Sequence, residues 1–216
     1  MVAHEYAHGY AALKQGDSTA SQLGRLTWNP VKHIDPFMTI LMPLLTFYGS
    51  GGRVMFGGAK PVPVNPANYR NFRRGDIIVS LAGIAINICL AVVCALLIVA
   101  LGVAARALPA LGESAAIVQH MMEFGLFFNL MLAVFNLLPI PPLDGSHVMK
   151  YLLPPAWSLR YQQVGRFGIL IVLILVATNI GRPVFNAWMK PVWVILQFAL
   201  DTYTPFLLKP SVFLGM

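Results

Sequence analysis

Long uncharged runs alternate with short polar connections along this chain. Residues 77–105 contain no Asp, Glu, Lys or Arg, and neither do residues 124–143. A helix needs about 20 apolar residues to cross the hydrocarbon core of a bilayer, so both runs are long enough to span it. We therefore expect transmembrane helices at 76–105 and 115–138. The pattern predicts an all-α fold, a polytopic transmembrane helical bundle.

Prolines and glycines break the remaining apolar sequence into short irregular segments. Residues 36–48 contain Pro43 and are followed by a glycine-rich turn, which predicts a short or re-entrant segment. Residues 60–66 hold three prolines, so they should be extended, either as a loop on the headgroups or as an edge for another peptide. Residues 139–145 end the second span, and residues 167–181 form a further apolar run that is shorter than a full span.

The two ends of the chain differ from its centre. Residues 1–15 have a helical composition, but a helix from Met1 to Leu13 would be only about 20 Å long. We therefore expect an N-terminal helix to be missing from this chain. Residues 183–216 mix aromatic and lysine side chains, which favour membrane interfaces, and predict an interfacial segment or a short span. No internal repeat is visible, so residues 1–216 are expected to form a single membrane-embedded domain.

Composition favours an integral membrane protein. Hydrophobic residues make up 57% of the chain and charged residues 11%, whereas soluble domains carry about a quarter charged residues. The formal net charge is +7, a balance that in a soluble protein would suggest nucleic acid. Here the cations lie in the connections between apolar runs, where they would contact lipid headgroups. We predict a multi-pass protein in the lipid bilayer with no nucleic-acid partner.

The pattern that bears most directly on chemistry is His4-Glu5-Tyr6-Ala7-His8. Histidines four residues apart lie on one helix face, so both imidazoles can reach the same metal ion. The glutamate beside the first histidine can then accept a proton from a metal-bound water as a general base. The chain holds only five histidines and eight acidic residues, and ionisable groups in an apolar bundle are costly and by default functional. The pattern favours a zinc site over a chance arrangement.

A hydrolytic zinc site needs a third protein ligand and one open position. Asp144 is the first candidate because it follows a helix break between two apolar segments, where irregular backbone is buried in protein or lines a cavity. An aspartate at this place could instead cap the helix that follows. His147 is the alternative ligand, and His33 with Asp35 is a weaker candidate in a polar loop.

Two separated motifs occur in order along the chain. The first is His4-Glu5-x-x-His8, and the second, Asn-Leu-Leu-Pro-Ile-Pro-Pro-Leu-Asp-Gly, ends at Gly145. Together they resemble the signature motifs of the site-2 protease family of intramembrane zinc metalloproteases. The connections at 24–36 and 57–75 are similar to the compact bacterial and archaeal branch, and the resemblance extends to about residue 155.

The resemblance implies a zinc endopeptidase that hydrolyses peptide bonds in the transmembrane segment of a partner protein or peptide. It implies one Zn²⁺ per chain, held by His4, His8 and Asp144, with Glu5 as the catalytic base. The compact branch also implies the plasma membrane of a prokaryotic cell.

Two asparagines lie within the apolar spans, Asn87 and Asn136. The resemblance implies that both bind the substrate or its developing oxyanion. An unpaired amide would be expensive in lipid, so the alternative for each is an interhelical hydrogen bond.

Two other classes of function are open to this sequence. A non-catalytic membrane protein of the same fold could bind a partner, and the short start of the chain favours it. A transporter could use intramembrane His and Asp residues to carry metal or protons. A transporter has no need for Glu5 beside His4, however, and the chain shows no matching pair of broken helices.

Overall fold

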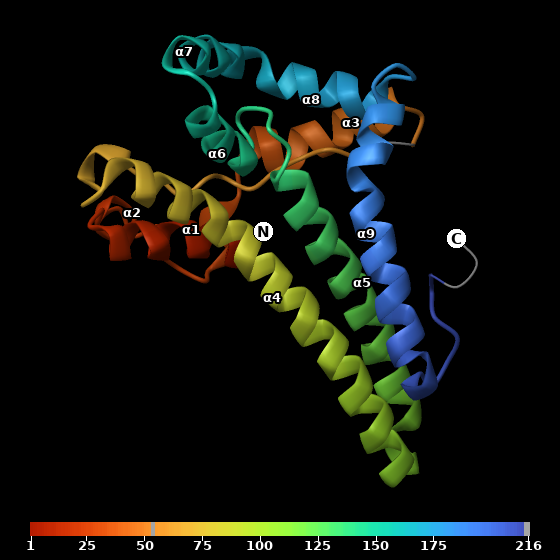
Figure 1. The fold of residues 1–216 in the computed structure, drawn as a ribbon. Coiled ribbons are helices and arrows are strands. Elements are labelled where there is room, and N and C mark those ends of the chain that lie inside the picture. The colour runs from red at the N-terminus through yellow and green to blue at the C-terminus, as the bar shows by residue number, and fades with distance from the viewer. Residues whose placement is uncertain (53–54, 214–216) are drawn as a thin grey trace. The chain divides into compact units, whose positions relative to one another are not determined.

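The computed structural model describes residues 1–52 and 55–213, and every regular element within these ranges is a helix (Figure 1). This confirms the predicted all-α fold. Three helical stretches are long and apolar enough to cross a membrane, at Phe72–Ala107, Pro109–Asn136 and Pro155–Ala177. The first two correspond to the expected spans. The third begins well before the apolar run at 167–181, because a single 3-10 turn joins two shorter helices into one stretch.

The helices divide between two compact units. The first unit comprises Met1–Ile86 with Asn136–Ala187, and the second comprises Asn87–Phe135 with Trp188–Met216. The α-helices are α1 (Val2–Gln15), α2 (Thr19–Gln22), α3 (Met42–Gly49), α4 (Phe72–Ala107), α5 (Gly112–Asn136), α6 (Asp144–Leu152), α7 (Pro155–Val164), α8 (Gly168–Ala177) and α9 (Arg182–Tyr203). A π-helix covers Pro36–Leu41, and 3-10 turns cover Pro30–His33, Pro66–Asn68, Pro109–Leu111, Gly165–Phe167 and Thr204–Phe206. The expectation of one domain stays a prediction.

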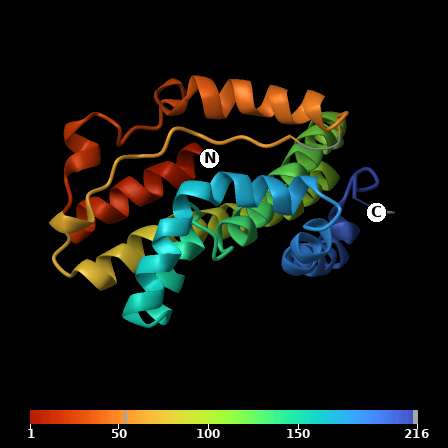
Figure 2. The same cartoon turned by 90° about the horizontal axis from the view of Figure 1, so that it is seen from above.

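In the first unit, the proline-rich segment at 57–65 is extended and runs between α1 and α3 (Figure 2). Helix α1 ends at Gly16, whose φ of 111° suits a residue without a side chain. Asp17 follows and is fully buried. It accepts hydrogen bonds from the backbone N–H of Asn65 (2.6 Å) and from the side-chain amide of Asn68 (2.9 Å). The end of α1 therefore anchors the end of the extended segment.

These contacts also set the charge of Asp17. Burial raises the pKa of its carboxyl group, but the donors of Asn65, Thr19 and Asn68 outweigh burial, and the pKa lies below its ordinary value. Asp17 is thus a buried carboxylate that is held ionised by neighbouring N–H and O–H groups.

In the second unit, two buried polar residues of α5 hold the chain that follows α9. The Gln119 amide donates to the carbonyl of Phe206 (3.0 Å), and its oxygen accepts from the N–H of Leu208 (3.1 Å). The carboxylate of Glu123 accepts from the Tyr203 hydroxyl (3.4 Å) and from the N–H of Val212 (3.3 Å). Both side chains are no more than 1% exposed. The polar atoms of this cluster are therefore satisfied by the unit's own chain.

Candidate metal centre

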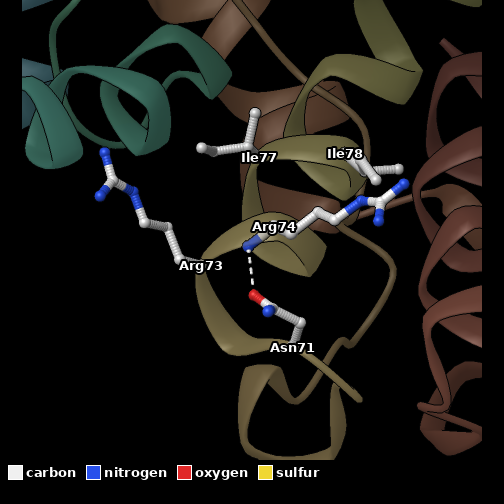
Figure 3. A pocket seen from close by; sticks show the side chains of 5 residues that line it. All are labelled: Asn71, Arg73, Arg74, Ile77 and Ile78. Atoms are coloured by element: carbon white, nitrogen blue, oxygen red, sulfur yellow. Dashed lines mark hydrogen bonds between the residues drawn. The ribbon is translucent and has the colours of Figure 1, made fainter.

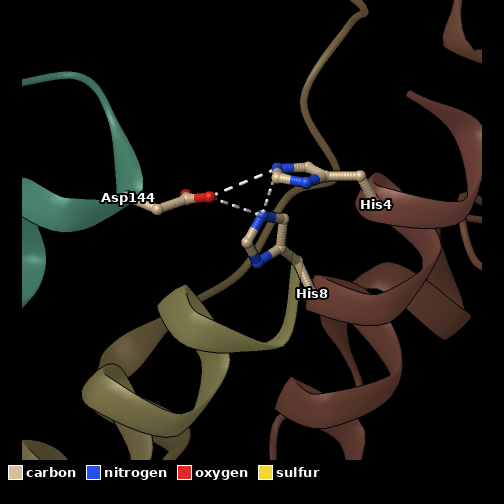
Figure 4. A group of neighbouring side chains, drawn as sticks. All are labelled: His4, His8 and Asp144. Atoms are coloured by element: carbon tan, nitrogen blue, oxygen red, sulfur yellow. Dashed lines mark hydrogen bonds and ion pairs between the residues drawn. The ribbon is translucent and has the colours of Figure 1, made fainter. Parts of the chain in front are cut away.

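Helix α1 places His4 and His8 on one face, one turn apart, as their spacing predicts. Their Nε2 atoms are 3.0 Å apart. Asp144, at the start of α6, points toward both rings (Figure 4), with its Oδ2 atom 3.2 Å from Nε2 of His4 and 3.4 Å from Nε2 of His8. Among the described residues, these three form the one group of His, Cys, Asp or Glu side chains that could hold a metal ion.

The hydrogen bond on the far side of the His8 ring decides which nitrogen faces Asp144. Nδ1 of His8 lies 2.7 Å from the carbonyl oxygen of Val79. A carbonyl only accepts, so Nδ1 carries the proton, and in the neutral ring Nε2 presents its lone pair. A carbonyl partner of this kind commonly orients metal-binding histidines. The residues present therefore fit a divalent cation.

The charges around this group favour a positive species between the three side chains. Burial lowers the pKa of His8, but the Asp144 carboxylate and the Val79 carbonyl outweigh burial and raise it. Burial raises the pKa of Asp144, but the two imidazoles outweigh burial and lower it to about 2. A proton and a metal cation compete for the same lone pairs, so a site built this way binds metal more weakly as the pH falls.

Gly83 of α4 lies against the face of the histidine pair. A Cβ atom built there would stand 2.5 Å from Nε2 of His8 and 2.7 Å from Nε2 of His4. No side chain fits such a space without moving an imidazole. A glycine at this position lets α4 approach the centre closely.

Glu5 is buried, 8% exposed, and is oriented by the extended segment. Its Oε2 atom accepts a hydrogen bond of 2.8 Å from the backbone N–H of Val62. This bond therefore orients the carboxylate on the helix that also carries the two candidate ligands, His4 and His8. The proposed base is thus held by a group far from it in sequence.

The contacts around Asp144 bear on whether this residue caps the helix that follows it. Helix α6 begins at Asp144 after Leu143, and no side chain caps its N-terminus. Gly145 packs against the carbonyl oxygen of Leu137, where a side chain would collide with the backbone. The Asp144 carboxylate contacts the two histidines, and the described residues show no side-chain cap at the start of α6; its role as a metal ligand stays a prediction.

A cavity of about 640 Å³ adjoins these residues and lies within the first unit. It is lined by the extended segment, by the start of α4 and by α6, and its polar lining includes His4, Glu5, His8, Asp76, Asn136, Asp144 and His147. A cavity of this size can hold a short stretch of extended peptide.

A second cavity, of about 330 Å³, lies at the start of α4 around Asn71 and Ile77 (Figure 3). Arg73 and Arg74 line it, but their guanidinium groups extend in different directions (Figure 3). It contains no metal-binding side chain. Arginines at the end of an apolar span are typical of the lipid headgroup level.

The other predicted residues have separate places. Asn136 lines the 640 Å³ cavity. Asn87 is buried on α4 and belongs to the second unit. His33 contacts the carbonyl of Thr27 through Nε2 (2.9 Å), and Asp35 accepts from backbone N–H groups at the start of the π-helix. His147, the alternative ligand, is hydrogen-bonded to Asp76 through Nδ1 (3.2 Å).

Three features of the site were not identified from the sequence: the Val62 N–H, the close approach at Gly83, and the buried carboxylate of Asp76. A backbone donor leaves no mark on a sequence. Asp76, however, is the last charged residue before the uncharged run at 77–105. An acidic residue at the edge of a membrane span is a signal that could have been weighed.

Comparison with known proteins gives the class that this fold and site define. Residues 1–177 match peptidase family M50. The chain belongs to this family, that of the site-2 proteases, which are zinc metalloproteases; this confirms the resemblance noted in the sequence.

Two relatives illustrate the match. YwhC of Bacillus subtilis (strain 168) is 37% identical over 188 residues, which cover 85% of this chain and 81% of YwhC. Rip2 of Mycolicibacterium smegmatis is 33% identical over 188 residues, which cover 87% of this chain and 66% of Rip2. Both names include the words zinc metalloprotease. No solved structure matches the chain.

Proposed function

We propose that this protein is an intramembrane zinc endopeptidase that hydrolyses peptide bonds in the transmembrane segment of a partner protein. The observation that carries the proposal is the convergence of His4, His8 and Asp144 on the cavity that Glu5 also lines. The described residues also include three helical stretches able to cross a membrane. We also propose that it is a multi-pass protein in the plasma membrane of a prokaryotic cell. The two relatives named above are bacterial proteins, which supports this.

His4, His8 and Asp144 would hold one zinc ion per chain. When bound, zinc polarises a substrate carbonyl and lowers the pKa of bound water to near 7. A His-His-carboxylate set with one open position is a composition known for catalytic zinc. The carbonyl of Val79 keeps His8 in the tautomer that can bind metal, and Gly83 leaves the histidines the space to do so.

Glu5 would move the protons. Its carboxylate lies beside the metal-binding face, accepts the proton of the attacking water and returns it to the leaving amine. The Val62 N–H donates to Oε2, which holds the carboxylate in one orientation. Asn136, on the wall of the same cavity, would donate from its amide to the substrate carbonyl. Asn87 lies one helical turn after Gly83 on α4, and we propose a substrate-binding role for it as well.

A substrate helix must unwind before any of these groups can reach its backbone. Its carbonyl groups are otherwise shielded by the hydrogen bonds of the helix, and unwinding in lipid exposes polar groups at a cost of several kcal/mol each. A cavity lined by polar side chains lowers this cost by hydrating or binding those groups. The protein thus needs a substrate-binding surface as well as a metal.

Metal removal tests this function. Purified protein in liposomes should contain about one zinc per chain and should cleave a labelled transmembrane peptide. A chelator should abolish cleavage, and added zinc should restore it. A zinc-loaded protein that cuts no transmembrane peptide would favour the non-catalytic alternative, and zinc-dependent ion flux without cleavage would favour a transporter.

A further inference from the structure

The first unit contains a second cluster of polar side chains, centred on Asp76. This aspartate lies near the start of α4 and is 3% exposed. Three side chains from α6 converge on it. Nδ1 of His147 lies 3.2 Å from Oδ1, Nζ of Lys150 lies 2.6 Å from Oδ2, and the Tyr151 hydroxyl donates to Oδ2 over 2.9 Å.

The same helix carries Asp144. Positions 144, 147 and 151 recur at helical spacing, so their side chains share one face of α6. Asp144, at the start of that face, contacts the histidine pair of α1. His147 and Tyr151, further along the same face, are hydrogen-bonded to Asp76 of α4. His147 consequently stands one turn from the metal-binding carboxylate. His147 lines the same cavity as Glu5 and Asp144.

The partners of Asp76 determine which nitrogen of His147 is available. Asp76 accepts from the ammonium of Lys150 and the hydroxyl of Tyr151, so it is a carboxylate with no proton to donate. Nδ1 of His147 lies 3.2 Å from this carboxylate and 3.5 Å from the Lys150 ammonium. The ammonium is much closer to Asp76 (2.6 Å), so we assign Nδ1 as the donor in the shorter contact with Asp76. In the neutral ring, Nε2 keeps a lone pair. The side chain is 42% exposed, and the residue lines the cavity.

We propose that His147 is a substrate-binding residue whose Nε2 accepts a hydrogen bond from a backbone N–H of the unwound transmembrane peptide, and that Asp76 is the positioning residue that orients its ring. The inference rests on the proposed function, because it assigns a role within the same cavity. Unwinding a helix in lipid creates N–H groups without partners. An oriented acceptor one turn from the metal-binding aspartate meets that need directly.

Binding can be measured without catalysis, using the Glu5→Gln chain in liposomes and a fluorescent transmembrane peptide that is not cleaved. His147→Ala in this background should weaken peptide binding by about 5- to 10-fold, the effect of one hydrogen bond. His147→Gln should restore most of the affinity, since a glutamine oxygen can also accept. Tyr151→Phe is the matched control: it removes one bond from Asp76 without touching His147, and should change affinity by less than about 2-fold.

Kinetics in the active chain then separate the roles. His147→Ala should raise KM by a similar factor, leave kcat within about 2-fold and keep full zinc content. Asp76→Ala should raise KM in the wild-type background and add nothing in the His147→Ala background, since it acts through His147. Melting temperatures identify any variant that fails to fold, and His147→Gln, which leaves Asp76 in place, keeps the test decisive in that case.

Three results would overturn the inference. Unchanged peptide binding in His147→Ala would remove the proposed acceptor. Loss of zinc in His147→Ala would make this histidine a metal ligand. A large fall in kcat that His147→Gln does not rescue would indicate proton transfer, because glutamine can accept a hydrogen bond but cannot carry a proton. The proposed function fails differently: the wild-type chain would then lack zinc or cleavage, whatever the binding measurement shows.

Discussion

The two units each bury a polar cluster, and the clusters differ in where their hydrogen bonds lead. In the second unit, the amide of Gln119 and the carboxylate of Glu123 bond to backbone groups and to a tyrosine of the same unit. In the first unit, the imidazoles of His4 and His8 direct ring nitrogens at each other and at Asp144, and a 640 Å³ cavity adjoins them.

This difference qualifies a general expectation. Ionisable residues within membrane spans are by default candidates for function. Glu123 meets that description, since it is fully buried on α5, yet its carboxylate is used to hold the chain that follows α9. Burial alone therefore does not identify a site. In the first unit, lone pairs from several side chains also converge beside a cavity, and that convergence is what makes the group a candidate site.

The largest expected effect is on zinc content. His8→Ala removes one of three proposed ligands and should lose nearly all bound zinc together with cleavage. Metal analysis of the purified variant and a peptide-cleavage assay check this. Glu123→Gln is the comparison from the second unit and should retain about one zinc per chain. Equal zinc loss in both variants would erase the distinction between the clusters.

A matched pair on α4 tests the two regions through backbone contact. Gly83→Ala puts a methyl group against the histidine pair and should weaken zinc binding by about 10- to 100-fold, the range for changes that misorient metal ligands. Gly102→Ala puts the same group against the carbonyl of Phe206 in the second unit. It should lower the melting temperature and leave zinc affinity unchanged. Zinc affinities of the two variants, measured by competition with a chelating dye, test this difference. Equal affinities in Gly83→Ala and Gly102→Ala would contradict it.

Glu123→Gln should have a smaller effect, confined to stability. The amide nitrogen replaces one acceptor oxygen and can only donate, so either the Tyr203 hydroxyl proton or the Val212 N–H loses its acceptor. The loss of a buried hydrogen bond costs about 1–3 kcal/mol, which lowers the melting temperature by roughly 2–12 °C. Thermal unfolding in detergent measures it. An unchanged melting temperature would mean that the carboxylate does not hold the C-terminal segment.

The smallest effect concerns Asp17 and pH. Its pKa is lower in the folded protein than in the unfolded chain, where it is about 3.9. The carboxylate therefore stabilises the fold fully above that unfolded value, and the contribution is lost as the pH falls through the folded pKa. Asp17→Asn should lower stability at neutral pH by more than it does in acid. Asp201→Asn, which makes the same change of charge at an exposed position, is the matched control.

The sequence predicted the parts of the site that depend on helix periodicity. Histidines four residues apart must share a face, and the structure brings their Nε2 atoms to 3.0 Å. The helix break before Asp144 likewise indicated an aspartate directed into protein. The sequence did not predict the third membrane-length stretch, Pro155–Ala177, because Gly165 and Arg166 interrupt the apolar pattern of that stretch.

Contacts between segments that lie far apart in the sequence could not be predicted from the sequence pattern, for a physical reason. The Val62 N–H donates to Glu5, and Gly83 lies close to the two histidines. Both contacts depend on how α1, the extended segment and α4 pack together. Neither a backbone donor nor a missing side chain leaves a periodic signal. Asp76 could be seen at the edge of an uncharged run, but its three partners on α6 lie more than 70 positions away.

The most direct test of the central claim is a paired measurement of zinc content and cleavage in Glu5→Gln. The substitution preserves shape but removes the group that accepts the proton, so the variant should keep about one zinc per chain. Its cleavage of a transmembrane peptide in liposomes should fall by about 100- to 10,000-fold. Glu113→Gln, at an exposed position near the start of α5, should cleave like the wild type. Cleavage at the wild-type rate by zinc-loaded Glu5→Gln would contradict the account.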